Sequence, residues 1–298
     1  MLPSVITGAV TTVSRSLKQS TIQPSPLYSS NNNLTAMIFS FSGTGNSYHV
    51  AQKLCVALDT NYVDMAPAER YGRYEYDAKG EPVGFVFPVY YMGLPDMVRR
   101  FVSSVKVKNP GKTFCVTTCG GESGVACEIL SEILEGRLTI DSYHDIVMPD
   151  NAIFAPYEMA SPEDNVKLLE GTDASIDAIA GRIADGVAGD FRTCAGQEGS
   201  RELYKLYDEH RVTENFHLND RCVECRICEE VCPEQIIKVY HRKPVWDEEK
   251  CTMCMCCLNL CPKTAIEYGE HTTGRARYNH PDFHMRKLGG QPTDYISG

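Results

Sequence analysis

The chain lacks both a long apolar run and an excess of basic charge. No apolar stretch among its 298 residues reaches the roughly 20 residues that a membrane-spanning helix needs. The formal net charge of −10 disfavours nonspecific binding to nucleic acid and suits docking onto basic patches of partner proteins. The composition therefore predicts a globular protein of one to three domains that binds neither nucleic acid nor membranes.

The first 36 residues lack acidic side chains altogether. They contain Arg15 and Lys18 among many Ser, Thr and Asn residues, and too few apolar residues to order themselves. Two interpretations remain open. The segment is either an organelle transit peptide, which would place the protein in a mitochondrion-related organelle, or sequence upstream of a true start at Met37. We exclude it from the fold as a disordered extension.

Cysteine, in contrast, is abundant, and eight of the 14 cysteines form two copies of one spacing. In each copy, successive cysteines are three, three and four residues apart, and a proline directly follows the fourth cysteine. The copies are offset by 29 residues, and they consist of Cys222, Cys225, Cys228, Cys232 with Pro233 and Cys251, Cys254, Cys257, Cys261 with Pro262. This is the bacterial ferredoxin signature, and its doubling predicts two [4Fe-4S] clusters.

The fourth cysteine of each run is expected to ligate the other cluster. The first cluster would then be bound by Cys222, Cys225, Cys228 and Cys261, and the second by Cys251, Cys254, Cys257 and Cys232. Structural zinc is a poorer interpretation, because zinc sites usually take cysteines as separated pairs. Disulfides would need a secreted context, whereas the apolar or small-residue surroundings of Cys55, Cys115, Cys127 and Cys194 indicate a reducing, cytoplasmic interior.

Upstream of the cysteines, strand and helix patterns alternate. Apolar runs predict strands, helical spacing predicts the helices between them, and such alternation is typical of a parallel sheet covered on both faces. The predicted strands are 37–41, 61–64, 83–89, 113–118 and 143–148, and the predicted helices are 46–58, 94–105, 124–134 and 165–188. A connecting helix is expected at 202–214.

A hydroxyl- and glycine-rich loop joins the first strand to the first helix. Its backbone N–H groups, its hydroxyls and the positive end of the helix could cradle a phosphate. The loop consists of Ser42, Gly43, Thr44, Gly45, Asn46 and Ser47. Tyr48 stands where a dinucleotide loop would have its third glycine, and Gly-Lys-Ser/Thr is absent. An ordinary helix N-cap is the alternative.

This loop resembles the flavodoxin phosphate loop, matched at Ser42, Thr44, Gly45 and Ser47. From Met37 to about Tyr268 the chain resembles the fusions of a flavodoxin-like domain with a two-cluster ferredoxin, the EFR-type ferredoxins of anaerobic microbes. The resemblance implies FMN and an α/β fold, a doubly wound parallel five-stranded sheet of order 2-1-3-4-5 followed by a small α+β two-[4Fe-4S] domain. The domains expected are 37–195 for FMN, 196–217 as linker and connecting helix, 218–268 for the clusters and 269–298 as an irregular tail.

Two further loops follow strands of the predicted sheet and would meet the flavin at the switch point. In the first, Tyr90 or Tyr91 would stack on the ring, and the Met92-Gly93 peptide would rotate its carbonyl toward N5 of the semiquinone, because glycine tolerates positive φ. In the second, Cys119, Gly120, Gly121 and Glu122 would offer N–H groups to the pyrimidine edge. Glu122 would lower the potential, unless it is a solvated loop carboxylate.

The cysteine runs depart from the usual pattern at three positions. Glu224 and Arg226 stand where such runs often have glycine, and Cys256 adjoins Cys257 and could replace it as a ligand, although the three-residue rhythm favours Cys257. The sequence predicts an electron-transfer protein with two [4Fe-4S] clusters and one FMN, serving redox protein partners and coupling one- and two-electron steps. The alternative is an FMN-dependent oxidoreductase that reduces a bound small molecule.

Overall fold

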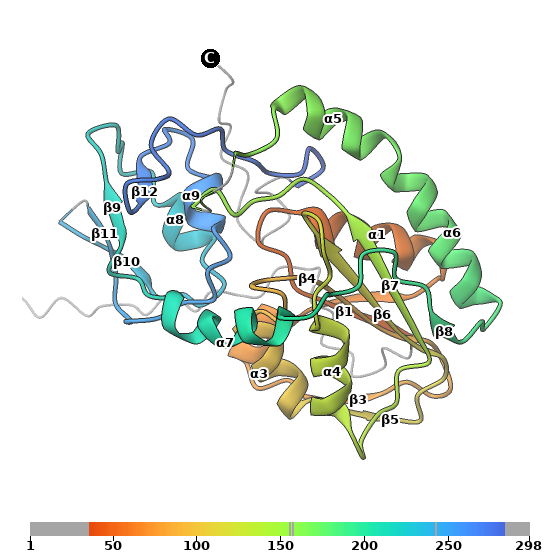
Figure 1. The fold of residues 1–298 in the computed structure, drawn as a ribbon. Helices are drawn as coiled ribbons and strands as arrows, with labels where there is room; N and C mark the ends of the chain where they lie inside the picture. The colour runs from red at the N-terminus through yellow and green to blue at the C-terminus, as the bar shows by residue number, and fades with distance from the viewer. Residues whose placement is uncertain (1–35, 155, 157, 242, 284–298) are drawn as a thin grey trace, which may run out of the picture. The chain divides into compact units, whose positions relative to one another are not determined.

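Six parallel strands form the main sheet, in the order β2-β1-β4-β6-β7-β8 (Figure 1). The computed structural model describes residues 36–283 except 155, 157 and 242, so the predictions for 1–35 and 284–298 lie outside the described residues. The strands are β1 (Met37–Ser40), β2 (Asn61–Asp64), β4 (Val83–Pro88), β6 (Thr113–Cys119), β7 (Ser142–Val147) and β8 (Gly189–Asp190).

The first five of these strands have the flavodoxin-like order that was predicted. The prediction of five strands was wrong by one, because β8 pairs in parallel with β7 at the edge. Gly189 and Asp190 are exposed and give no apolar pattern from which a strand could be recognised. The central strands were clear because they are buried on both faces, as parallel strands between helices must be.

Helices cover both faces of the sheet (Figure 1). On one face α1 (Asn46–Ala57) and α6 (Thr172–Ala184) bury Leu54 and Ile179 against Ile38 and Val116. On the other face α3 (Asp96–Ser104) and α4 (Ala126–Leu134) contribute Phe101 and Leu130 to a core with Phe39 and Phe85. Each face therefore has its own apolar layer, although only the second layer continues into the cysteine region.

Several local elements differ from the prediction. The single helix expected at 165–188 is two helices, α5 (Pro162–Glu170) and α6, which meet at Gly171. The side chain of Ser161 accepts the Asp164 N–H and caps α5, a Ser-Pro start signal that the prediction missed. Also unpredicted are α2 (Met65–Arg70) and the parallel pair β3 (Glu75–Asp77) and β5 (Lys106–Lys108). The connecting helix is α7 (Ser200–His210).

The cysteine region consists of two small antiparallel strand pairs and two single-turn helices. The pairs are β10 (Ile237–Tyr240) with β11 (Lys243–Trp246), and β9 (Phe216–Leu218) with β12 (Ile266–Tyr268). The helices are α8 (Ile227–Glu230) and α9 (Cys256–Asn259), one inside each cysteine run. This arrangement agrees with the small α+β domain that was predicted.

The 29-residue repeat of the sequence is also a repeat of the backbone. Residues with positive φ recur at that offset, as the pairs Glu224 and Met253, Arg226 and Met255, and Gln235 and Thr264. The N–H of Gln235 donates to the Cys232 carbonyl, and the N–H of Thr264 donates to the Cys261 carbonyl. Glycine is common at such positions because it adopts positive φ without strain, so Glu224 and Arg226 fill conformations that glycine usually takes.

One apolar core joins the α/β part to the cysteine region. The cluster that contains Phe101 and Leu130 also contains Tyr207 of α7, Ile227 of α8 and Leu258 of α9. Both regions accordingly fall in one unit of the chain, Asn31–Gly298. Within the described part of the chain, none of the helices combines the length and the apolar character needed to cross a bilayer.

Candidate functional site

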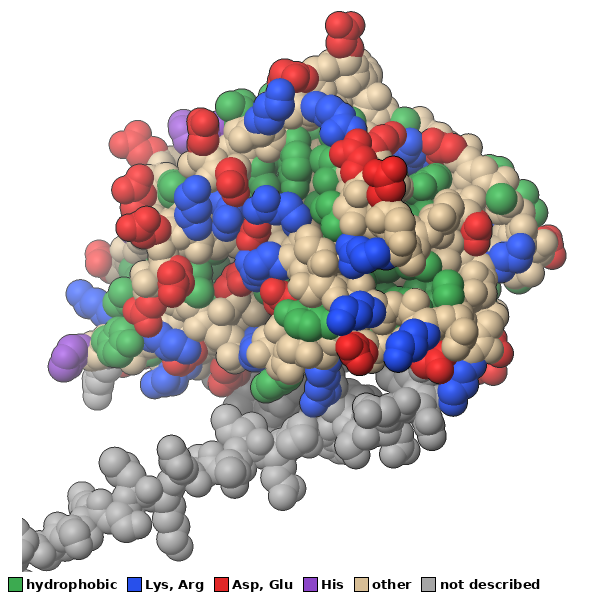
Figure 2. Space-filling view, turned by 90° about the horizontal axis from the view of Figure 1, so that it is seen from below, with side chains coloured by type: hydrophobic (Ala, Val, Ile, Leu, Met, Phe, Trp, Pro, Cys, Tyr) green, Lys and Arg blue, Asp and Glu red, His purple; other side chains and the backbone are tan. Residues whose placement is uncertain are grey.

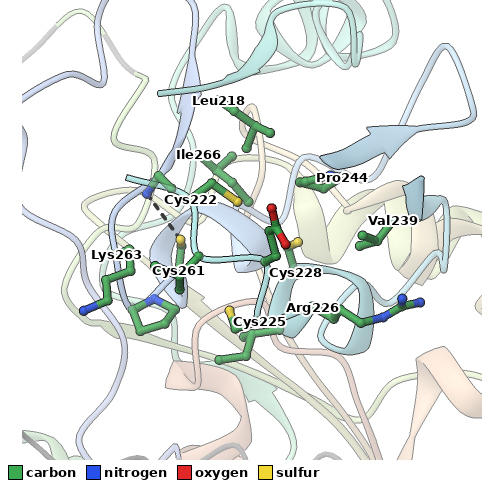
Figure 3. A pocket seen from close by; sticks show the side chains of 15 residues that line it. Leu218, Cys222, Cys225, Arg226, Cys228, Val239, Pro244, Cys261, Lys263 and Ile266 are labelled. Carbon is green, nitrogen blue, oxygen red and sulfur yellow. Dashed lines mark hydrogen bonds between the residues drawn. The ribbon is translucent and has the colours of Figure 1, made fainter. Parts of the chain in front are cut away.

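The first set of predicted cluster ligands surrounds one cavity. Cys222, Cys225, Cys228 and Cys261 all line it (Figure 3). Apolar side chains from β9, β10 and β12 line it as well, namely Leu218, Val239 and Ile266. The structure thus brings together the three cysteines of the first run and the last cysteine of the second, as crossed ligation requires.

The second set of predicted ligands is also brought together. The pKa of Cys257 is raised by burial and then by the neighbouring thiols of Cys254, Cys232 and Cys251. Burial and the nearby Cys254 thiol raise the pKa of Cys232 to about 11. Four thiols held this closely cannot all ionise unless a positive core compensates their charge. An iron–sulfur cluster supplies such a core, so the chemistry of this donor set fits a cluster.

Backbone N–H groups point at the sulfur atoms. The N–H of Met253 donates to Cys251 Sγ and the N–H of Ala265 donates to Cys261 Sγ, each at 3.2 Å. Hydrogen bonds of this kind raise the reduction potential of a cluster, because they stabilise its more negative form. The protein thus has the means to tune a bound cluster at both sites.

Cys256 lies beside the second set of thiols but occupies a core position of the repeat. Its 29-residue counterpart is Ile227, which is buried and apolar, and Cys256 itself is 3% exposed. A hydrogen bond with Cys254 and burial raise its pKa. The repeat therefore favours Cys257 over Cys256 as the ligand, in agreement with the spacing argument.

The predicted phosphate loop lies at the carboxyl end of β1, directly before α1. Gly45 precedes the helix with φ of 104°, and no side chain caps the helix N-terminus. The Ser42 side chain accepts the Gly45 N–H at 3.1 Å, and Ser47 Oγ lies 2.7 Å from Thr118 Oγ1. The alternative of an ordinary side-chain N-cap does not describe this helix. An uncapped helix start with a buried Thr44 fits an anion.

The space beside the loop glycines is filled by other segments of the chain. A Cβ on Gly43 would lie 2.5 Å from the Cys254 carbonyl oxygen and 2.9 Å from the Tyr90 hydroxyl, and a Cβ on Gly45 would collide with Phe283. The buried Tyr90 hydroxyl makes no hydrogen bond of standard geometry, although Asn151 lies close enough to act on its pKa. A phosphorylated ligand on the loop would add an acceptor for that hydroxyl, so the residues fit the group.

The backbone of the 90–93 turn shows which of its positions need special residues. Tyr91 and Met92 have φ of 50° and 65°, whereas Gly93 is not in the left-handed region. Gly93 is required because a Cβ there would collide with the Tyr204 ring. A substitution of Gly93 would therefore displace α7 as well as stiffen the peptide. The rotation of the Met92-Gly93 peptide stays a prediction.

The two candidate stacking tyrosines face different neighbours. Tyr90 turns its hydroxyl toward Gly43. The Tyr91 ring packs among three aromatic rings, at centroid distances of 6.4 Å from Phe154, 5.5 Å from Tyr207 and 5.6 Å from His210. Of the two, Tyr90 is therefore the nearer to the phosphate loop. Stacking of either ring on a flavin stays a prediction.

The loop at 119–124 is bound to the linker after β8. The Ser123 N–H donates to the Cys194 carbonyl at 2.7 Å, and Glu122 Oε1 accepts from the Gln197 side chain at 3.1 Å. A Cβ on Gly120 would meet Asp150, whereas Gly121 has open space around it. Burial raises the pKa of Cys119 to about 12, so this thiol stays protonated and is no nucleophile near neutral pH.

Two asparagines that the sequence analysis missed connect the phosphate loop to the second cysteine run. Asn151 Nδ2 donates to Thr44 Oγ1 at 3.0 Å and to the Cys254 carbonyl at 3.4 Å. Asn259 of α9 donates through Nδ2 to the Asn151 carbonyl at 3.3 Å. Isolated asparagines in a loop and at the end of a short helix give no signal in one sequence.

An ion-pair network joins α3 to the end of the first cysteine run. The buried carboxylate of Asp96 contacts Arg99 and Arg100, and Arg100 Nη2 lies 2.7 Å from Glu234 Oε2. Glu234 also accepts the hydroxyl of Thr252. Because Thr252 directly follows Cys251, the network fixes the second ligand loop against the α/β part.

Charges of both signs are mixed on the face of the molecule seen in Figure 2, with apolar side chains between them. Lys and Arg side chains there lie among Asp and Glu side chains. This face therefore does not form a patch of one sign.

Comparisons with known proteins bear on both parts of the chain. Residues 221–265 match the family described as 4Fe-4S dicluster domain. No curated protein matches the chain significantly. The α/β part is similar to an FMN-dependent NADH-azoreductase from Bacillus anthracis, solved with FMN, at 10% identity and a TM-score of 0.33 over 50% of this chain and 98% of that one. It is also similar to the Trp repressor binding protein from Bacillus subtilis, at 14% identity and a TM-score of 0.32 over 49% and 96%.

Proposed function

We propose that this protein is an electron-transfer flavo-iron–sulfur protein that binds two [4Fe-4S] clusters and one FMN. The match of residues 221–265 to the dicluster domain family and the two groups of four cysteines support the clusters. The flavodoxin-like strand order and the uncapped start of α1 after the 42–47 loop support FMN. The protein would exchange electrons with redox protein partners, as the EFR-type fusion proteins that it resembles would.

One contact carries this proposal. Gly43 of the phosphate loop lies against the backbone of Cys254, a predicted ligand of the second cluster, so closely that a Cβ would not fit between them. Asn151 bonds to both the loop and Cys254. A flavin whose phosphate rests on this loop would therefore lie next to the second cluster. The order of electron carriers that follows is first cluster, second cluster, flavin.

Bound FMN would supply a centre that accepts two electrons, whereas each cluster exchanges one. In a protein that couples one-electron and two-electron steps in this way, the chain's own groups would have defined tasks. Gly43 and Gly45 let the backbone approach the phosphate, and Thr44 and Ser47 line its loop. The Met253 and Ala265 N–H groups tune the cluster sulfurs. The apolar packing of α9 keeps water away from the second site.

The alternative function, reduction of a small molecule at the flavin, would need a cavity with a proton donor beside the predicted flavin loops. The two cavities described here lie elsewhere. The first is the one around Cys222, and the second is an open groove near Arg100, Arg211 and Lys250. Neither is lined by residues of the 42–47 loop, by Tyr90 or by Glu122.

The test is anaerobic purification of the full chain with iron, sulfide and FMN quantified, followed by titration with a one-electron reductant. We expect about eight irons and about one FMN per chain, with the flavin absorbance bleaching through the clusters. Transfer to cytochrome or flavodoxin surrogates, compared with a panel of small acceptors, separates the two functions. Zinc in place of iron, or a colourless preparation, would refute the proposal.

A further inference from the structure

Residues 278–283 follow the last strand and lie directly on the phosphate loop. The His280 N–H donates to the Thr44 carbonyl at 2.8 Å, and the Tyr278 hydroxyl donates to Asn46 Oδ1 at 2.7 Å. Phe283 occupies the space that a side chain on Gly45 would need. The sequence analysis placed this segment, which we call the strap, in an irregular tail. It has neither helix nor strand, yet Tyr278, His280 and Phe283 are all buried.

The strap also holds the helix of the second cysteine run. The Tyr278 N–H donates to Asn259 Oδ1 at 2.9 Å, and Asn259 donates onward to the Asn151 carbonyl. Asn151 in turn bonds to Thr44. These hydrogen bonds form a circuit from the phosphate loop through Asn151, Asn259 and Tyr278 back to the loop at Asn46. Every polar side chain in the circuit has a partner, which favours one fixed arrangement.

Polar and ring contacts bind the far end of the strap to α1 and α6. His49 of α1 lies 2.9 Å from Asp282 through Nδ1 and 2.9 Å from Asp173 of α6 through Nε2. The His49 and His280 rings stack at 4.2 Å. Ligand atoms of His49, His280 and Asp282 lie within 4.8 Å of one another. Since both His49 nitrogens already face carboxylates, these contacts hold the strap against α1 and α6 and supply no argument for a metal.

We propose that the strap is the outer wall of the cofactor site and that Tyr278 is a positioning residue for the phosphate loop. The inference rests on the proposed binding of FMN. The strap would hold Thr44 and Asn46 in the conformation that receives a phosphate, and would hold α9 and its cluster at a fixed place beside them. Loss of the strap would then weaken the binding of FMN while each half of the cysteine region keeps its ligands.

The experiment measures the Kd of FMN for full-length protein and for four variants, by the quenching of FMN fluorescence under anaerobic conditions. One variant ends after Arg277 and lacks the strap. Its control ends after Phe283 and keeps every described residue. Tyr278→Phe removes the hydroxyl that binds Asn46. Its control is Tyr240→Phe at the end of β10, which removes a hydroxyl that donates to Asp247 at 3.3 Å, away from the phosphate loop.

We expect the chain that ends after Arg277 to bind FMN at least about tenfold more weakly, because it loses the bonds of Tyr278 and His280 to the loop. Tyr278→Phe should bind FMN about threefold to tenfold more weakly, as for one lost hydrogen bond. Both controls should bind as the wild type does. Riboflavin, which lacks the phosphate, should bind Tyr278→Phe as well as it binds the wild type, because the hydroxyl acts on the phosphate loop. Iron content should stay constant throughout, which shows that the variants fold.

The outcomes separate the two proposals. If the wild type binds FMN and the chain that ends after Arg277 binds it equally well, the strap is only packing and this inference is overturned. Equal weakening of FMN and riboflavin by Tyr278→Phe would also overturn the role assigned to the phosphate loop. If the wild type itself binds no FMN, while its iron content is full, the proposed flavin function fails and the strap inference fails with it.

Discussion

The two halves of the cysteine region have the same spacing and the same backbone but opposite surroundings. In the first half, Val223, Glu224 and Arg226 are exposed, and Cys222 and Cys225 are half-buried. In the second half, every residue from Thr252 to Asn259 is buried. The difference does not come from the repeat itself. It comes from neighbours of the second half, namely the phosphate loop, Asn151, the strap, and Tyr207 of α7, whose hydroxyl donates to the Thr252 carbonyl at 2.7 Å.

Under the proposed function, this asymmetry would give different tasks to two otherwise equivalent sites. A cluster in the first half would be open to a partner protein, and a cluster in the second half would be shielded from water and next to the flavin loop. Low exposure lowers the local dielectric and, with N–H donors to sulfur, changes the potential of a cluster. The same eight-cysteine motif can thus provide both an electron entry point and an internal relay. The four predictions that follow test that division.

Removal of one ligand should have the largest effect, and a different effect in each half. Cys225→Ser should lose one cluster, leaving about four irons, and keep FMN. Cys254→Ser should lose the other cluster and FMN together, because the Cys254 backbone lies on Gly43 and accepts from Asn151. Iron and FMN analysis of anaerobic preparations measures both. Retention of FMN by Cys254→Ser would contradict the claim that the second half, unlike the first, supports the binding of FMN.

Positions 234 and 263 are equivalent in the repeat but differ in their contacts. Glu234 binds Arg100 and Thr252 and is 14% exposed at its side chain, whereas Lys263 is exposed. Glu234→Ala would leave Arg100 without one of its carboxylate partners and should cost about 2 kcal/mol, or about 5 °C in apparent Tm. Lys263→Ala should change stability by less than about 0.5 kcal/mol. Equal shifts in anaerobic thermal scans would contradict a stabilising role for the network that joins Glu234, at the end of the first cysteine run, to Arg100 and to Thr252 of the second run.

How much the sequence could reveal also differs between the halves. Periodicity located the parallel strands, and cysteine spacing predicted both ligand sets, because these signals are local and repeat along the chain. The burial of 252–259 could not be predicted, since it depends on contacts with Asn151 and Tyr278, which are distant in sequence and give no signal as single residues. The edge strand β8 was missed for a related reason. Its two exposed residues have no apolar pattern and pair only because β7 is adjacent.

Glycine substitutions at Arg226 and Met255 should separate backbone strain from burial. Both residues have positive φ, 64° and 55°. Arg226→Gly should relieve strain at an exposed site and raise stability by about 0.5 kcal/mol, after the entropy cost of glycine. Met255→Gly gains the same relief but loses a side chain that is 1% exposed, for a net loss of about 2 kcal/mol. Shifts of the same sign in thermal scans would mean that burial does not distinguish the halves.

Cys256→Ala should have the smallest effect on iron content among the cysteine variants, because its repeat counterpart Ile227 indicates that the position belongs to the core. We expect iron to stay near eight per chain and stability to fall by about 1 kcal/mol from the lost thiol packing. Cys257→Ala, its immediate neighbour, should instead reduce iron to about four. A drop in iron for Cys256→Ala, with no drop for Cys257→Ala, would mean that Cys256 replaces Cys257 as a ligand of the second cluster. The two halves would then differ in their ligand positions as well as in their burial. Iron analysis of the two single variants side by side decides between them.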